Sequence, residues 1–319
     1  MRKFAVLCAL LFVSIASFYF SSCNNTGKEA ETQTTQNKDS VARIERGEYL
    51  ANHIALCVDC HSTRDITKWS LPVVPGSEGG GAGFPFTKTE MVPGVVFAPN
   101  ITPFGLKDWS DDDIIKAMTT GVNKKGDTLF PIMPYHNYSR AAKDDIYSII
   151  SYIRTLKSID SLRPPRKLDI SMSMLGPLAQ PDLSKNVLPD PSDKIKYGEY
   201  LVTLASCSDC HTPRTPQGVP LFDKAFSGGF VFATPFFKVA VANITPDSST
   251  GIGGLSEDAF VQKFKANANP EKININPGRE NSIMPWSMYG TMKEEDLRAI
   301  YSYLHSVKPV TNKVEKWPK

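Results

Sequence analysis

Hydrophobic and polar positions divide the chain into an apolar start, a polar stretch and two similar bodies. Residues 4–20 are almost entirely apolar, whereas residues 24–40 contain almost nothing that a core could bury. Apolar residues then recur at the spacing of one helical face from Arg43 to Leu56, and again from Lys194 to Ser206. The pattern predicts a helix in each of these two stretches, and each helix runs directly into a pair of cysteines.

Two further helices are predicted in each body. Ser110 and Ser256 stand before acidic residues, as helix N-caps do, and should open short middle helices. A last helix is expected at about 141–157 and another at about 292–306, the second introduced by a capping box from Thr291 to Glu294. The same succession of helices is therefore expected twice.

The segments between these helices predict loops. Residues 65–99 and 215–242 are rich in glycine, proline and phenylalanine. We therefore expect a mostly α fold with long loops and little sheet.

Four short segments of the first body return in the same order in the second. The first cysteines of the two bodies are 150 residues apart, and the methionines of a repeated Ile-Met-Pro are 151 apart. Chance similarity does not keep order and spacing over such lengths, so the pattern predicts a tandem repeat. The matched segments are Gly47-Glu48-Tyr49-Leu50 with Gly198-Glu199-Tyr200-Leu201, Cys57 to Arg64 with Cys207 to Arg214, Asn100 to Pro103 with Asn243 to Pro246, and Ile132-Met133-Pro134 with Ile283-Met284-Pro285.

The repeat predicts two homologous domains, at residues 42–158 and 193–310. A chain of 319 residues suits two domains of about 120–150 residues better than one. Residues 159–192 contain six prolines and are expected to form a stiff, extended connector, and residues 311–319 a tail. The predicted fold class is mostly α, with two tandem domains and long loops.

The N-terminus predicts export. Two basic residues precede the apolar run and small residues follow it, as in a secretory signal over residues 1–22. Cys23, after two serines, resembles the lipidation site of a bacterial lipoprotein signal, which would anchor the mature chain on the periplasmic side of a bacterial membrane. Residues 23–41 would then be a flexible tether. An uncleaved anchor and simple cleavage without lipidation are the alternatives.

Composition limits the partners. The chain has 36 basic and 33 acidic residues, so its formal charge is only +3. So small a surplus argues against nucleic acid as a partner and against electrostatic adhesion to anionic lipid.

Each body carries one Cys-x-x-Cys-His motif. Two thiols three residues apart on one helical turn can bond to the two vinyl groups of one haem, and the adjoining histidine can then bind the iron. A disulfide, a zinc half-site and a thioredoxin-type redox pair are the alternatives. A redox pair does not need the histidine, and zinc needs two further ligands at fixed spacing, which neither half provides. Covalent attachment of two haems c is therefore favoured. The motif residues are Cys57, Cys60 and His61, and Cys207, Cys210 and His211.

A methionine at the same place in each half is the predicted second axial ligand. Met133 follows Cys60 by 73 residues, and Met284 follows Cys210 by 74. A thioether is a soft ligand that raises the haem potential relative to a second imidazole. Core packing is the ordinary role of any single methionine, but the matched positions favour ligation. His136 is a local competitor, and the repeat has no histidine in the corresponding place.

Two weaker signals recur in both halves. Arg64 and Arg214 each follow the motif histidine by three residues, and their guanidinium groups could bind a haem propionate; a solvated surface charge is the alternative. Asn100 and Asn243 open the repeated Asn-Ile-Thr-Pro, where a contact near the haem edge and a plain turn are equally consistent with the sequence.

Together these motifs resemble a tandem class I cytochrome c, and more narrowly the multihaem cytochrome c subunits of bacterial membrane-bound alcohol and gluconate dehydrogenases. The resemblance implies two cytochrome c-like domains, each with one haem c whose axial ligands are a histidine and a methionine. Carried over to this sequence, the ligands are His61 with Met133 and His211 with Met284. Those subunits usually carry three haems, whereas this chain has two motifs.

The resemblance implies an electron carrier rather than an enzyme, because two six-coordinate haems leave no site for a substrate. Its partners would be a periplasmic or membrane dehydrogenase, or a respiratory protein such as an oxidase, and a terminal acceptor. The alternative is a di-haem cytochrome c peroxidase-like enzyme, which needs one open iron and two dissimilar domains. A redox sensor or assembly module is a further hypothesis, although no signalling element accompanies the domains.

Overall fold

A computed structural model describes residues 39–87, 92–172, 181–215 and 218–318. The predicted signal, Cys23 and most of the predicted tether lie outside the described residues. The last three tether residues, 39–41, are helical, which corrects the expectation of a flexible stretch there, because a helix extends readily from a segment that is already folded. By compactness the chain divides into Met1–Ile44 and Glu45–Lys319.

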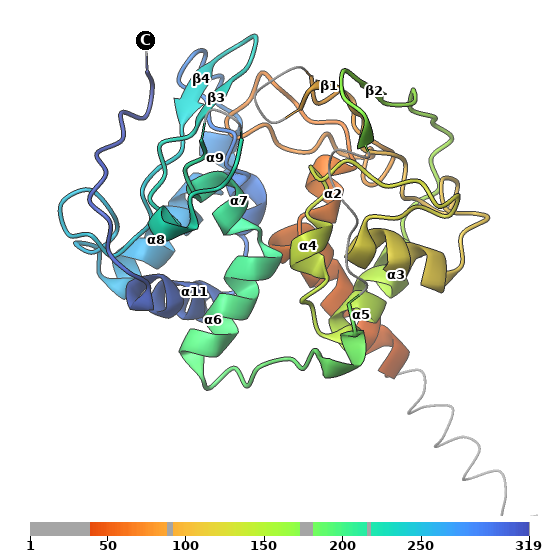
Figure 1. The fold of residues 1–319 in the computed structure, drawn as a ribbon, viewed down its shortest axis with the longest axis horizontal. Coiled ribbons are helices and arrows are strands. Elements are labelled where there is room, and N and C mark those ends of the chain that lie inside the picture. Colours follow the sequence, from red (N-terminus) through yellow and green to blue (C-terminus); the bar gives the residue numbers. More distant parts are fainter. Residues whose placement is uncertain (1–38, 88–91, 173–180, 216–217, 319) are drawn as a thin grey trace, which may run out of the picture. The chain divides into compact units, whose positions relative to one another are not determined.

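The helices of Glu45–Lys319 confirm the prediction of a mostly α fold (Figure 1). Before the predicted connector, in what is called the first half below, the elements are the π-helix η1 (Leu50–Ile54), α2 (Cys57–Cys60), α3 (Asp111–Thr120), α4 (Tyr135–Tyr138) and α5 (Lys143–Ile153). The second half contains α6 (Lys194–Leu204), α7 (Cys207–His211), α8 (Glu257–Asn267), α9 (Pro270–Ile273), α10 (Trp286–Tyr289) and α11 (Glu294–Ser306). Two short 3-10 helices, η3 (Leu183–Lys185) and η4 (Phe222–Lys224), lie in connecting segments. In the described part of the chain no helix has both the length and the apolar character that a membrane span requires.

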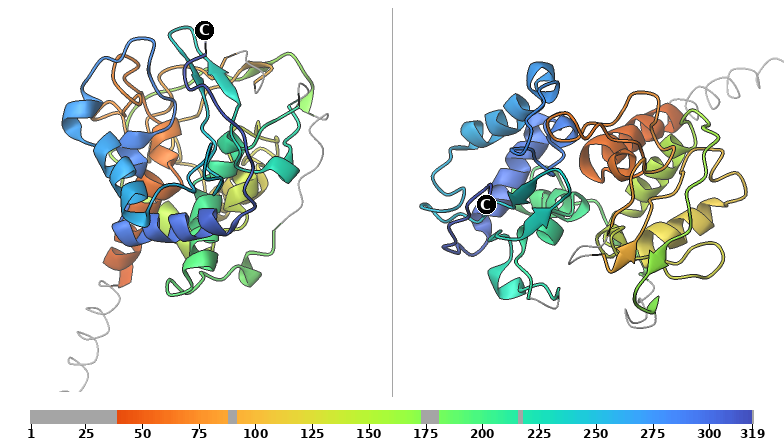
Figure 2. Two further views of the ribbon diagram at one scale, coloured as in Figure 1. Left: turned by 90° about the vertical axis from the view of Figure 1, so that its left-hand side faces the viewer. Right: turned by 90° about the horizontal axis from the view of Figure 1, so that it is seen from above.

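The strands are short. β1 (Gly94–Val95) pairs antiparallel with β2 (Lys167–Leu168), and β3 (Val231–Ala233) pairs antiparallel with β4 (Lys238–Ala240) (Figure 2). β2 belongs to the predicted connector. The start of that connector is also bonded to the first half, since the Asn100 amide donates to the carbonyl oxygen of residue 159 at 2.7 Å. The first part of the connector therefore runs along the first half.

The starts of α3 and α8 follow from side-chain capping, whereas α11 begins two residues later than predicted. Ser110 and Ser256 are the N-caps of α3 and α8, as predicted. The capping box expected from Thr291 is wrong, because Lys293 is the N-cap of α11 and no side chain of that segment caps it. Instead the backbone N–H of Lys293 donates to the hydroxyl group of Tyr49 at 3.0 Å. Tyr49, from the first half, therefore accepts a hydrogen bond at the start of α11, where the sequence had predicted a capping box.

Two helices of the second half, α6 and α11, cross at a glycine (Figure 1). A β-carbon on Gly198 would lie 2.0 Å from the carbonyl oxygen of Ala299, so the two backbones are in contact. The first half repeats the arrangement, since a β-carbon on Gly47 would lie 1.8 Å from the carbonyl oxygen of Ser148. The repeated Gly-Glu-Tyr-Leu therefore begins with the residue that lets the first and last helices of each half approach.

We expect Gly198→Ala to lower the free energy of unfolding by about 3 kcal/mol, because the added methyl group forces two helix backbones apart. Chemical denaturation of the purified protein measures this change. Gly254→Ala is the matched control, since its β-carbon would meet nothing closer than the carbonyl oxygen of Ser248 at 3.5 Å. Equal stability of the two variants would contradict the close crossing.

Reciprocal hydrogen bonds from tyrosine to carboxylate join the two halves. The Tyr200 hydroxyl donates to Asp145 at 2.6 Å, and the Tyr49 hydroxyl donates to Asp296 at 2.5 Å. Both carboxylates are buried, and Asp145 also accepts two hydrogen bonds from Arg46. Burial raises the pKa of Tyr49 and of Tyr200 well above its ordinary value, and the neighbouring carboxylates raise it further. Neutral tyrosine hydroxyl groups therefore connect the halves.

A raised tyrosine pKa makes the folded protein less stable at high pH, because the unfolded tyrosine ionises first, above about pH 10. Stability from this source should be retained below about pH 10 and then fall by about 1.4 kcal/mol per pH unit for each tyrosine held neutral. Tyr200→Phe has one fewer tyrosine that is held neutral in the folded protein. Its free energy of unfolding should therefore fall less steeply with rising pH than that of the parent protein. Denaturation at a series of pH values between 9 and 11 (roughly one unit either side of the ordinary tyrosine pKa) measures how the free energy of unfolding changes with pH in both proteins. Equal slopes for the parent protein and Tyr200→Phe would refute the prediction.

Candidate functional site

Each cysteine pair occupies a single helical turn, the first in α2 and the second in α7. Both turns begin after a non-glycine residue in the left-handed region, Leu56 in the first half and Ser206 in the second, each with φ 54°. That conformation is unfavourable for a residue with a side chain and persists only where the surroundings fix it. The same sharp change of chain direction therefore sets both cysteine turns.

The four motif thiols are free, so neither pair forms a disulfide in this structure. Burial raises the pKa of each thiol to about 12, which keeps all four neutral at pH 7. Catalytic redox pairs depend on a thiol with a lowered pKa, so this environment is the opposite of the one a thioredoxin-type pair requires.

The two motif histidines are buried and held in the same way. Nδ1 of His61 lies 2.7 Å from the carbonyl oxygen of Pro99, and Nδ1 of His211 lies 2.8 Å from that of Ala242. A carbonyl oxygen only accepts, so Nδ1 carries the proton and Nε2 keeps its lone pair. Burial lowers the pKa of both rings, that of His211 to about 4, so they are neutral. Metal-binding histidines are typically oriented by a hydrogen bond of this kind.

A buried tyrosine ties each methionine segment to the cysteine segment of the same half. The Tyr138 hydroxyl donates to the carbonyl oxygen of Ala55 at 2.7 Å, and the Tyr289 hydroxyl donates to that of Ala205 at 2.6 Å. Each tyrosine comes five residues after the predicted methionine ligand and bonds two residues before the first cysteine. Both methionines and the first cysteine of each pair also pack against one hydrophobic core. These two tyrosines were not among the predicted site residues, although their matched positions in the two halves are a signal that could have identified them.

The two motif arginines have different partners. Arg64 forms an ion pair with Asp59 at 3.0 Å, inside its own motif. Arg214 donates to the backbone carbonyl oxygens of Gly218 at 2.9 Å and Asp209 at 3.2 Å. The predicted role of these arginines toward a propionate stays a prediction.

The repeated asparagines form turns. The Asn100 side-chain oxygen accepts from the backbone N–H and the hydroxyl group of Thr102, and Asn243 accepts from Thr245 in the same two ways. All four residues are buried. Both motifs are thus explained as structural turns, and the carbonyl oxygens that hold the motif histidines come from the residues directly before these asparagines.

The local competitor of Met133 is occupied elsewhere. Nε2 of His136 lies 3.1 Å from a carboxylate oxygen of Asp209, which belongs to the cysteine motif of the second half. The Asn137 amide next to it donates to the other oxygen of the same carboxylate at 3.1 Å and to Ser206 at 3.0 Å. The start of α4 in the first half therefore contacts the cysteine turn of the second.

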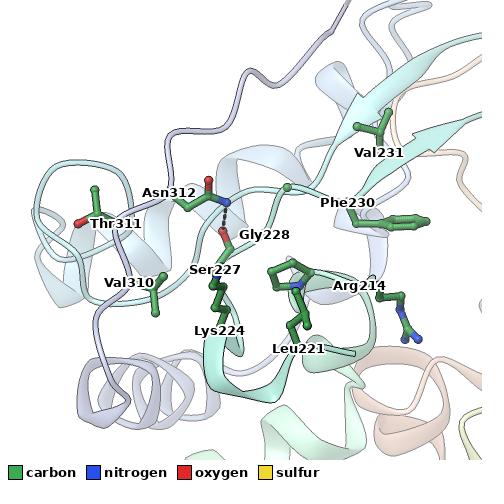
Figure 3. Close-up of a pocket in the computed structure, with 12 residues that line it drawn as sticks. Arg214, Leu221, Lys224, Ser227, Gly228, Phe230, Val231, Val310, Thr311 and Asn312 are labelled. Atoms are coloured by element: carbon green, nitrogen blue, oxygen red, sulfur yellow. Dashed lines mark hydrogen bonds between the residues drawn. The ribbon is translucent and has the colours of Figure 1, made fainter. Parts of the chain in front are cut away.

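A surface cavity of about 550 Å³ lies beside the second motif (Figure 3). Its lining includes Arg214, Lys224 and Phe230, and on one wall the Asn312 amide donates to the carbonyl oxygen of Ser227 at 2.9 Å. Neither the cysteines nor the methionine of the second half line it. The cavity therefore places Arg214 beside open space without reaching the predicted iron ligands.

No protein-family model matches the chain. The gluconate 2-dehydrogenase cytochrome c subunit of Pantoea cypripedii is 29% identical to it over 284 residues, which is 83% of this chain and 60% of that protein. The alcohol dehydrogenase (quinone) cytochrome c subunit of Gluconacetobacter polyoxogenes is 30% identical over 297 residues, 86% of this chain and 58% of that protein. A diheme cytochrome c-type protein of Cereibacter sphaeroides is 26% identical over 264 residues, 79% of this chain and 81% of that protein.

The chain is a homologue of dehydrogenase cytochrome c subunits. This cytochrome c homologue spans 60% or less of the length of the two dehydrogenase subunits above, so it corresponds to part of them. The resemblance drawn from its motifs is confirmed, and homology to cytochromes c implies covalently bound haem c.

The residues present fit that cofactor. Neutral thiols on one helical turn and a neutral histidine with a free Nε2 are the donor set that haem c requires. Two buried donors, Nε1 of Trp69 and Nε of Arg163, also have no hydrogen-bond partner among the described residues. A haem carries two carboxylates, which are acceptors of the kind these donors lack. Neither residue belongs to one of the repeated motifs, so the repeat did not mark them as donors to a haem.

Proposed function

We propose that this chain is a di-haem c-type cytochrome that carries electrons and has no catalytic site of its own. One haem would be bonded to Cys57 and Cys60 and the other to Cys207 and Cys210, each within its own domain, at 42–158 and 193–310. The observation that supports this best is that a buried histidine oriented through Nδ1 follows each cysteine pair.

A bound haem would supply the redox-active iron, and the side chains would determine its ligands and its surroundings. His61 and His211 would bind iron through Nε2, while the carbonyl oxygens that accept from Nδ1 fix the orientation of both rings. Met133 and Met284 would be the second ligands, held near the cysteine turns by the two tyrosine hydrogen bonds described above. Thioether ligation favours the reduced iron and so raises the potential.

A di-haem peroxidase is the less favoured function. Such an enzyme needs one iron with an open position, and here both halves offer the same pair of ligand residues at the same places. The two halves also repeat the same tyrosine, histidine and glycine contacts. The relatives named above are cytochrome c subunits and a diheme cytochrome c, and none of them carries the name of a peroxidase.

The proposed electron donor is a dehydrogenase, because relatives of this chain are subunits of gluconate and alcohol dehydrogenases. We place the carrier on the periplasmic side of a bacterial membrane, with Cys23 lipidated and the following residues as a tether. Anchoring would keep the carrier close to membrane-bound partners, which matters because its small net charge provides little long-range steering.

A redox titration of the purified protein, followed by visible spectra, tests this function. We expect two one-electron steps, low-spin spectra throughout and a Met–iron charge-transfer band in the oxidised protein. The protein should be reduced rapidly by a small donor and should show negligible turnover with hydrogen peroxide in both the fully and the half-reduced forms. Turnover of tens per second (roughly the median for enzymes) from either form would favour the peroxidase instead.

A further inference from the structure

A loop of the first half, residues 66–71, is bonded to the methionine segment of the second half. The backbone N–H of Trp69 donates to the carbonyl oxygen of Ile275 at 2.9 Å, and the backbone N–H of Ser70 donates to the side chain of Asn281 at 2.9 Å. That asparagine in turn donates to the carbonyl oxygen of Lys68 at 3.0 Å. This loop will be called the 66–71 loop.

Side-chain contacts reinforce these hydrogen bonds. The indole of Trp69 lies under two ammonium groups of the second half, with Nζ of Lys272 5.1 Å and Nζ of Lys316 5.4 Å from a ring centroid. Leu71 is buried in a small apolar cluster with Phe237 and Val239, which also belong to the second half. The 66–71 loop is therefore part of the packing of the second half, although the chain places it in the first.

The Ser70 hydroxyl is bonded to the backbone directly after the predicted ligand, on both sides of Pro285. It donates to the carbonyl oxygen of Met284 at 2.8 Å and accepts from the backbone N–H of Trp286 at 2.7 Å. Ser70 is fully buried, and it and the following residue Leu71 adopt positive φ angles of 66° and 51°. Two successive non-glycine residues in this region are unfavourable, so the contacts with the second half must hold them there.

The methionine of the first half shares the local turn but not the contact from the other half. The carbonyl oxygen of Met133 accepts from the backbone N–H of Tyr135, and that of Met284 accepts from the backbone N–H of Trp286, each at 2.8 Å. The N–H of Met133 donates to the carbonyl oxygen of Phe130 at 3.4 Å, whereas that of Met284 donates to the Ser282 hydroxyl at 3.2 Å. Within the described ranges, no side chain of the second half bonds to the backbone of Met133. The two predicted ligands therefore share their place in the repeat but differ in what fixes their backbone.

We propose that Ser70 is a positioning residue in trans for the axial ligand Met284, so that the first half controls ligation of the haem in the second. This inference rests on the proposed function, because it assumes that Met284 binds iron. The hydroxyl group bonds to the two peptide groups that flank Pro285, directly after Met284, and so limits how far the thioether can move from the iron. Loss of the hydroxyl should make this ligand easier to displace and should leave Met133 unaffected.

Displacement of the methionine by imidazole in the oxidised, haem-loaded full chain tests the proposal. Met133→Ala provides the background, because the remaining Met–iron band then reports Met284 alone. Adding Ser70→Ala to this background should lower the imidazole concentration at half-displacement about tenfold, as expected for the loss of two hydrogen bonds at one carbonyl and one N–H group. Ser77→Ala is the matched control, since its hydroxyl bonds only within the first half, to residues 63 and 74, and it should leave that concentration unchanged.

Two further variants separate the possible failures. Ser70→Gly removes the hydroxyl and also suits the positive φ angle, so it should show the same tenfold change even if Ser70→Ala folds poorly. An unchanged imidazole concentration in Ser70→Gly, with or without a change in thermal stability, would mean that the loop is only a structural contact and would overturn the proposal. If Met284→Ala leaves the band of the Met133→Ala background intact, the ligand assignment itself is wrong.

Discussion

Met284→Ala is expected to open one of the two irons and to leave the other six-coordinate. Without the thioether the second haem becomes five-coordinate or binds water, so half of the Met–iron band should disappear. The potential of that haem should fall by roughly 0.2 V, well inside the range of about 0.8 V over which axial ligands tune haem iron. The open iron should also react with hydrogen peroxide, which must bind iron before its O–O bond can break. Redox titration with visible spectra and a peroxidase assay measure all three changes.

Met133→Ala should have the same effects on the first haem, because effects at separated sites are largely independent. Met288→Ala is the control for both variants, since this partly buried methionine lies on α10 close to the second site but is not a predicted ligand. It should keep the full band. A band that survives in Met284→Ala, or that disappears in Met288→Ala, would show that the ligand has been assigned to the wrong residue.

The double variant Cys207→Ala with Cys210→Ala is expected to retain one covalent haem, that of the first half. Its thioether bonds cannot form in the second half, which would lose the haem that we propose is bonded there. Because a group bound only by the folded state stabilises it, the second half should be less stable by on the order of 3 kcal/mol or more. Haem content by alkaline pyridine spectra and denaturation monitored by tryptophan fluorescence measure the two effects.

Cys23→Ala is the matched control for this double variant. Cys23 is the predicted lipidation site and lies outside the two motifs, so its loss should leave both haems in place and release the protein from the membrane fraction. Retention of two haems by the double variant would show that the second motif does not attach one.

Short-range patterns allowed much of the site to be predicted from the sequence. The cysteine turns depend on adjacent residues, and the caps Ser110 and Ser256 act on N–H groups three residues away. Met133 and Met284 could be proposed as ligands because they occupy matching places in the repeat, although they follow Cys60 and Cys210 by 73 and 74 residues. Their role as ligands stays a prediction. Signals that repeat, or that act within one turn, can be detected from a single sequence.

Contacts between the halves could not be predicted in this way. Ser70 is 214 residues from Met284, and the second half has no serine in a matching loop position that would have marked it. The capping box at Thr291 failed for the same reason, since Tyr49 of the first half supplies the acceptor that caps α11. Such contacts depend on how two folded surfaces meet, and neither periodicity nor local propensity encodes that.

If each Cys-x-x-Cys-His motif bonds one haem covalently, the intact mass of the purified mature protein must include both haems. The mass should be measured after denaturation in acid, which removes any haem held only by axial ligands. We expect the mass of the mature polypeptide plus two haems, with no haem extracted into acid acetone. A mass with one added haem or none, or a pigment that acid acetone removes, would contradict it.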